Sequence, residues 1–63
     1  MKTEHKGYKV KQDSDTHHVA IFDKNGHMVF HSQASKEKTV EELRATVDFY
    51  LMLSETLMEK EGG

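Results

Sequence analysis

The tetrapeptide Asp23-Lys24-Asn25-Gly26 is the strongest local signal in the chain, and it decides how the first half folds. An Asp at the first position and a Gly at the fourth are typical of a type I turn that is closed by a glycine at positive φ. The alternative is a type I′ turn centred on Asn25-Gly26. Either turn produces a tight antiparallel hairpin, but the cross-strand pairing differs by one residue, and we expect the type I turn.

Residues that favour strands lie on both sides of this turn. Residues 17–22 precede it, and residues 27–31 form the returning strand. A third strand is predicted over residues 7–12, where apolar and charged residues alternate with the period of two that marks a strand with one buried face. Four turn-forming residues, 13–16, separate it from the hairpin. The sequence therefore predicts a three-stranded antiparallel β-meander over residues 7–31.

One long helix is predicted for the second half of the chain. Its start is a capping box, in which the Thr39 hydroxyl accepts the N–H of Glu42 and the Glu42 carboxylate accepts the N–H of Thr39. No Gly or Pro interrupts the sequence from there to Gly62. We therefore expect a helix over residues 39–59.

The order of the elements indicates the fold class. Strands come first and the helix last, with no helix between strands, which is typical of an α+β fold in which a helix packs on an antiparallel sheet. Residues 1–63 are therefore predicted to be one small βββα domain. Residues 1–6 and 60–63 are expected to be disordered, because chain termini are ordered only when contacts hold them.

The predicted helix carries more apolar surface than one sheet can cover. When the helix advances about 100° per residue, one arc collects the apolar residues that suit a core; these are Val40, Leu43, Val47, Tyr50, Leu51, Leu57 and Met58. Phe49, Met52 and Leu53 widen the apolar surface to roughly twice the ~100° stripe of a helix with one buried face.

The predicted sheet also has large apolar residues on both faces. Side chains alternate between the two faces of a strand. One face is expected to hold Ala20, Phe22, Met28 and Phe30, and the other Val19, Ile21 and Val29. One helix cannot cover both faces of this sheet.

A second copy of the chain would cover the apolar surface that one helix and one sheet leave exposed. Leaving Phe49, Met52 and Leu53 in water forgoes ~1.5–3 kcal/mol each, comparable in sum with the ~3–5 kcal/mol that a core of this size supplies. We therefore expect a homodimer with these three residues in its interface. The alternative is a monomer whose helix frays before Phe49, or whose sheet face binds another protein.

The composition indicates the class of protein and the compartment that suits it. The chain has no cysteine, 35% hydrophobic residues and 32% charged residues, which suits a soluble domain in a reducing compartment. The N-terminus lacks the apolar segment of a secretory signal, and no apolar run approaches the ~20 residues that span a bilayer. We expect a cytoplasmic protein with no membrane contact.

No motif for catalysis, a metal or a cofactor is found. The adjacent His17 and His18 point to opposite faces of a strand, and His27 is expected to lie far from His17, so three convergent ligands do not arise. Nucleophile and phosphate-loop motifs are absent. We expect no catalytic residues, no metal site and no cofactor.

Two features suggest a macromolecular partner. Four carboxylates, called here the acidic ridge, share the helix arc that the apolar residues avoid: Glu41, Asp48, Glu55 and Glu59. Such a ridge can meet a basic partner or imitate the phosphates of a nucleic acid, although a helix strip that only faces water explains it more simply.

The second feature is a set of lysines in the strand half, which also contains Tyr8, Phe22 and Phe30. Sheet surfaces that bind single-stranded nucleic acid combine cations and aromatic rings in this way. The lysines are interleaved with acids, however, and the net charge is −2, so nucleic acid is the less favoured partner. The predicted function is that of a non-enzymatic homodimer that binds another macromolecule, with a protein as the expected partner.

Overall fold

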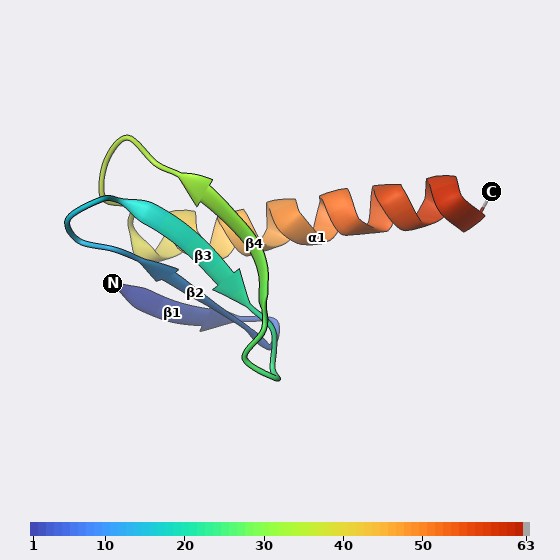
Figure 1. Ribbon diagram of the computed structural model, residues 1–63, viewed down its shortest axis with the longest axis horizontal. Coiled ribbons are helices and arrows are strands. Elements are labelled where there is room, and N and C mark those ends of the chain that lie inside the picture. Colours follow the sequence, from blue (N-terminus) through green and yellow to red (C-terminus); the bar gives the residue numbers. More distant parts are fainter. Residues whose placement is uncertain (63) are drawn as a thin grey trace.

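The computed structural model describes residues 1–62, and for residues 57–62 the helical backbone alone. Five elements follow one another: β1 (Lys2–His5), β2 (Tyr8–Gln12), β3 (His18–Phe22), β4 (Met28–Gln33) and α1 (Val40–Gly62). The strands form one antiparallel sheet in the order β1-β2-β3-β4, and α1 packs against one face of it (Figure 1). The predicted α+β class with a C-terminal helix is confirmed, whereas the predicted number of strands is wrong.

The additional strand is β1, in a segment that was expected to be disordered. It pairs with β2 so that Thr3 lies opposite Val10 and His5 opposite Tyr8. The two strands are joined by Lys6 and Gly7, whose φ angles of 53° and 83° are both positive, as a type I′ turn requires. None of the four residues of β1 is apolar, so no hydrophobic alternation marks it, and its backbone pairing with β2 holds it in place.

The hairpin between β3 and β4 has the expected turn. Gly26 donates its N–H to the carbonyl of Asp23 at 3.0 Å and has a φ of 84°, whereas Asn25 is not at positive φ. The turn is therefore type I, because a type I′ turn needs positive φ at both central residues. The Asp23 carboxylate also accepts the N–H of Asn25 and of His27, each at 2.9 Å.

A β-bulge changes which residues share a face of the sheet. Ile21 lies opposite Phe30, but Phe22 lies opposite Met28, so Val29 is an extra residue on β4. Phe30 therefore lies on the helix side with Ile21, where its ring is 5.9 Å from that of Tyr50. The expectation that Phe30 shares a face with Met28 is wrong for this reason.

The core is small and lies between the sheet and the first three turns of α1. Of the side chains that the structure describes, five apolar ones are fully buried: Val10, Val19 and Ile21 from the sheet, and Leu43 and Val47 from the helix. Tyr8 and Tyr50 extend it, with their rings edge to face at 5.7 Å.

One buried polar side chain organises the loops at this end of the core. Gln12 is only 4% exposed, and its amide nitrogen donates to the carbonyls of His17 and Lys36 at 3.0 and 2.9 Å. Its amide oxygen accepts the N–H of Lys38 at 2.7 Å. The side chain thereby joins the β2–β3 turn to the segment that leads from β4 into α1.

The predicted helix start is confirmed. Thr39 Oγ1 accepts the N–H of Glu42 at 3.1 Å, and the Glu42 carboxylate accepts the N–H of Thr39 at 2.9 Å. The helix runs to Gly62, three residues beyond the predicted end, so residues 60–62 are helical and Gly63 lies outside the described residues. The C-terminal half of α1 extends beyond the sheet (Figure 1).

Candidate interaction site

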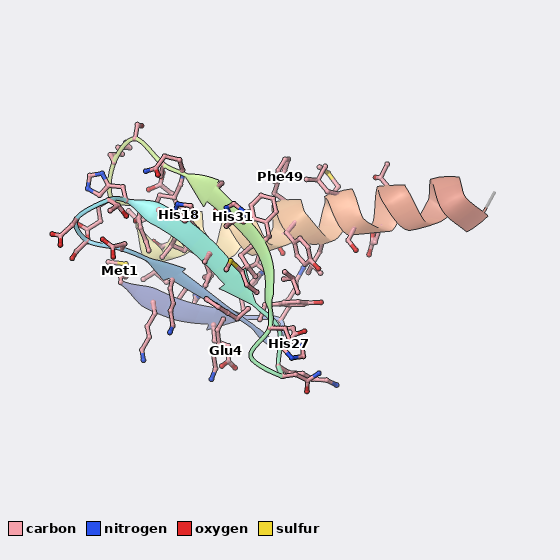
Figure 2. All side chains as sticks on the ribbon, viewed as in Figure 1. Met1, Glu4, His18, His27, His31 and Phe49 are labelled. Atoms are coloured by element: carbon pink, nitrogen blue, oxygen red, sulfur yellow. The ribbon has the colours of Figure 1, made fainter. Side chains whose placement is uncertain are left out.

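The residues predicted to form a dimer interface lie together on an exposed flank of α1. Phe49, Met52 and Leu53 are 48%, 54% and 38% exposed, and their spacing of three and four residues makes them neighbours on the helix surface. We call these three residues the apolar flank. The ring of Phe49 points away from the sheet (Figure 2). Among the described residues no other element buries these three side chains, and the C-terminal half of α1 extends beyond the sheet (Figure 1).

A groove continues the apolar flank toward β4. Its walls come from β4, from the segment after it and from α1; they include Phe30, Ala34, Thr46 and Phe49, and Lys36 and Lys38 also line it. The groove exists because α1 packs mainly on β1 and β2, on the far side of the sheet from β4. The helix side of the sheet is therefore less covered at β4, and Phe30 is only half-buried there.

The carboxylates of the acidic ridge lie in different environments in the structure. Glu41 and Glu55 are exposed, but Asp48 is paired: its Oδ1 accepts the Lys6 ammonium at 2.8 Å and lies 3.0 Å from Nε2 of His5. These hydrogen bonds, first from Lys6 and then from His5, lower the pKa of the Asp48 carboxyl below its ordinary value. The side chain of Glu59 lies outside the described residues.

Within the described part of the chain no element covers the sheet face opposite α1, and this face is basic. Cross-strand neighbours share a face, so the register places Lys2 beside Lys11 and Glu4 beside Lys9 on this open face. The Lys11 ammonium lies 5.4 Å from the centre of the Phe22 ring, within reach of a cation–π interaction. The open face thus combines three lysines with one acidic residue and an aromatic ring.

Two histidines complete the open face. The rings of His18 and His31 are stacked at 5.3 Å with an angle of 18° between them (Figure 2). The neighbouring His17 does not lie on a strand, because it has a φ of 65° and belongs to the turn before β3. Among the side chains of residues 1–56, no group of three or more His, Asp or Glu is placed to hold a metal ion.

No protein-family model, curated protein or solved structure matches this chain. In the part of the chain that the structure describes, no helix is both long and apolar enough to cross a membrane. The function is therefore inferred from the apolar flank, the groove, the acidic ridge and the open face.

Sequence reasoning suggested a sheet face with lysines and Phe22, but it missed what β1 adds to the open face and the partners of Asp48, for one reason. Both depend on β1, which supplies Lys2 and Glu4 to the open face and places His5 and Lys6 beside α1. The sequence feature that could have indicated β1 is Gly7, which follows a polar stretch and precedes a strand with alternating apolar and charged residues. A glycine in that position is compatible with a two-residue hairpin turn.

Proposed function

We propose that this protein is a non-enzymatic homodimer that binds another macromolecule, with a protein as its principal partner. The observation that carries the proposal is the apolar flank, in which three large apolar side chains are about half exposed on neighbouring positions of one helix. Fully burying such a side chain is worth ~1.5–3 kcal/mol. A second copy of the chain is a partner that is always present at the concentration of the first.

The small core supports association. Among residues 1–56, only five apolar side chains are fully buried, and a chain of this length supplies about 3–5 kcal/mol from its own core. Domains of this size commonly gain the remaining stability from a disulfide, a metal or a partner chain, and this chain has no cysteine.

The acidic ridge is the proposed contact for a basic protein partner. Glu41 and Glu55 are exposed and available for such a contact. Mimicry of a nucleic acid is less favoured, because the Lys6 ammonium compensates the charge of Asp48 and interrupts the row. A basic partner surface needs no regular spacing of the carboxylates.

A second candidate function is the binding of single-stranded nucleic acid on the open face. The arrangement of Lys2, Lys9 and Lys11 with Phe22 favours it, since sheet-surface binders neutralise phosphates with cations and stack bases on rings. The two functions use different surfaces of the molecule and can be separated experimentally.

Sedimentation equilibrium tests the homodimer, and an oligonucleotide titration tests the second candidate. We expect a mass twice the 7.3 kDa of one chain; a mass of 7.3 kDa at micromolar concentrations contradicts the proposal. Binding of a single-stranded oligonucleotide that weakens steeply between two salt concentrations, and that is lost in Lys9→Glu, would favour nucleic acid over protein as the partner.

A further inference from the structure

The two edges of the sheet differ in how they are protected. Exposed edge strands invite pairing with another chain, and proteins commonly block them with charged residues or proline. The β1 edge carries Lys2 and Glu4, both exposed. The β4 edge, of sequence MVFHSQ, carries no Lys, Arg, Asp, Glu or Pro. The β4 edge is thus the one that remains open to pairing with a further strand.

The groove and the apolar flank lie on the same side of the subunit as this edge. Phe30 of β4 and Phe49 of α1 line one groove, and β4 is the last strand that α1 passes in the view of Figure 1 before it extends beyond the sheet. The β4 edge, the groove and the flank therefore form one continuous surface that the subunit leaves uncovered.

The apolar flank alone is too small to form a stable interface. Taking roughly 200 Å² for a large side chain, the exposed fractions of Phe49, Met52 and Leu53 amount to roughly 250 Å² of apolar surface per subunit. A stable interface buries about 800 Å² per partner. The flank supplies about a third of that area, so the groove and the β4 edge beside it are needed for the remainder.

We propose that β4 pairs antiparallel with β4 of a second copy, about a two-fold axis perpendicular to the sheet. The two four-stranded sheets then join into one of eight strands, with both helices on the same side and the apolar flanks facing each other across the axis. A two-fold contact of this kind uses the same surface on both copies and closes on itself. The inference rests on the proposed homodimer and specifies its interface.

The orientation follows from the position of the apolar flanks. A two-fold axis perpendicular to the sheet keeps both helices on one side of the joined sheet, so that the two flanks can meet. A parallel pair of β4 strands, related by a two-fold axis along the strands, would place the helices on opposite faces and separate the flanks.

Single cysteines on the two edges test this arrangement directly, because the chain contains no cysteine of its own. Met28, His31 and Gln33 on β4, and Glu4 on β1, are all exposed, so Met28→Cys, His31→Cys, Gln33→Cys and the control Glu4→Cys should fold. Residues that face each other across an antiparallel pair have Cα atoms about 4.5–5.5 Å apart, which suits a disulfide. Each variant is oxidised, or treated with a short bismaleimide, and the dimeric fraction is measured on a denaturing gel.

We expect at least one β4 variant to become mostly cross-linked, and Glu4→Cys to remain monomeric on the gel. A second variant, His31→Lys, places a charge on the edge, and we expect it to raise the dissociation constant of the dimer at least tenfold. A wild-type protein that is dimeric, with no cross-linking at β4 and an unchanged dissociation constant for His31→Lys, overturns the β4 pairing but leaves the homodimer intact. A wild-type mass of 7.3 kDa overturns both.

Discussion

The amide oxygen of Gln12, on β2, accepts the backbone N–H of Lys38 at 2.7 Å, although the two residues are 26 positions apart in the chain. The same amide donates to the carbonyls of His17 and Lys36. Three backbone groups from two separate loops thus obtain their hydrogen bonds from one side chain that is almost fully buried. The position of the start of α1 relative to the sheet depends on this side chain.

Gln12→Leu is expected to lower the free energy of unfolding by about 2–4 kcal/mol. Leucine fills similar space but leaves the N–H of Lys38 and the carbonyls of His17 and Lys36 without their partner, and each buried unsatisfied group costs about 1–3 kcal/mol. Urea unfolding followed by circular dichroism measures the change. The exposed Gln33 provides the matched control, because Gln33→Leu should shift stability by less than about 1 kcal/mol; equal effects at the two positions would contradict the role of Gln12.

Gly26→Val is expected to destabilise the β3–β4 hairpin by about 1–3 kcal/mol. Gly26 has a φ of 84°, and a Cβ at this position meets no atom within 4 Å, so the cost is conformational and does not come from a clash. β-branched residues resist positive φ. Thermal unfolding compares this variant with Gly26→Asn, which tolerates the conformation better, and with Lys24→Val at a neighbouring turn position that has no such requirement. Equal melting temperatures for all three variants would show that the turn has been assigned wrongly.

Acidification is expected to destabilise the protein in part through Asp48. Its folded pKa is lowered, mainly by the hydrogen bond from Lys6, so its pairing contributes stability above the unfolded pKa of about 3.9. That contribution is lost as the pH falls through the lower folded pKa. Melting temperatures between pH 6 and pH 2 should therefore fall less steeply in Asp48→Asn than in the wild type.

The Asp48→Asn variant should keep some acid sensitivity, because hydrogen bonds from backbone N–H groups also lower the pKa values of Asp13, Asp23 and Glu42. Glu55→Gln is the matched control on the same helix, since Glu55 is exposed and makes no ion pair among the described residues. Parallel curves for the wild type and Asp48→Asn would mean that the pair with Lys6 contributes nothing to stability in solution.

Phe49→Asp combined with Leu53→Glu is expected to convert the proposed dimer into a monomer or to prevent folding of the isolated chain. A carboxylate without a partner in a desolvated interface costs several kcal/mol. Both side chains are exposed in the subunit, so a protein that works as a monomer should tolerate the two changes and gain solubility. Light scattering measures the mass, and Glu55→Gln should leave the assembly unchanged. A soluble double variant with the mass of the wild type would exclude the apolar flank as the interface.

Local signals predicted the parts of the fold that depend on neighbouring residues. The type I turn at Asp23–Gly26 and the capping box at Thr39 are confirmed, because each is decided by hydrogen bonds between residues at most four positions apart. The helix ends at Gly62, three residues beyond the predicted end. The glycines at 62 and 63 are the first helix-breaking residues after Thr39, and assigned helix ends commonly vary by one or two residues.

The sequence could not predict the features that depend on distant pairing. β1 has no apolar residue, so only its pairing with β2 identifies it, and the contact of Asp48 with Lys6 follows from that pairing. The bulge at Val29 moved Phe30 to the helix side, since a shift of one residue exchanges the two faces of a strand. Of the predicted interface, the structure brings Phe49, Met52 and Leu53 together and leaves them exposed, while the dimer itself stays a prediction.

The strand order β1-β2-β3-β4 has a consequence for the speed of folding. Each strand pairs with the next one along the chain through a short turn, so little loop entropy is lost before contacts form, and chains with such local contacts fold quickly. Folding of the subunit should be independent of concentration, whereas pairing of two subunits is bimolecular. If the proposed dimer forms, folded subunits should accumulate at low concentration as a kinetic intermediate with the β4 edge and the apolar flank both open, and chaperones or aggregation would intercept this species during synthesis.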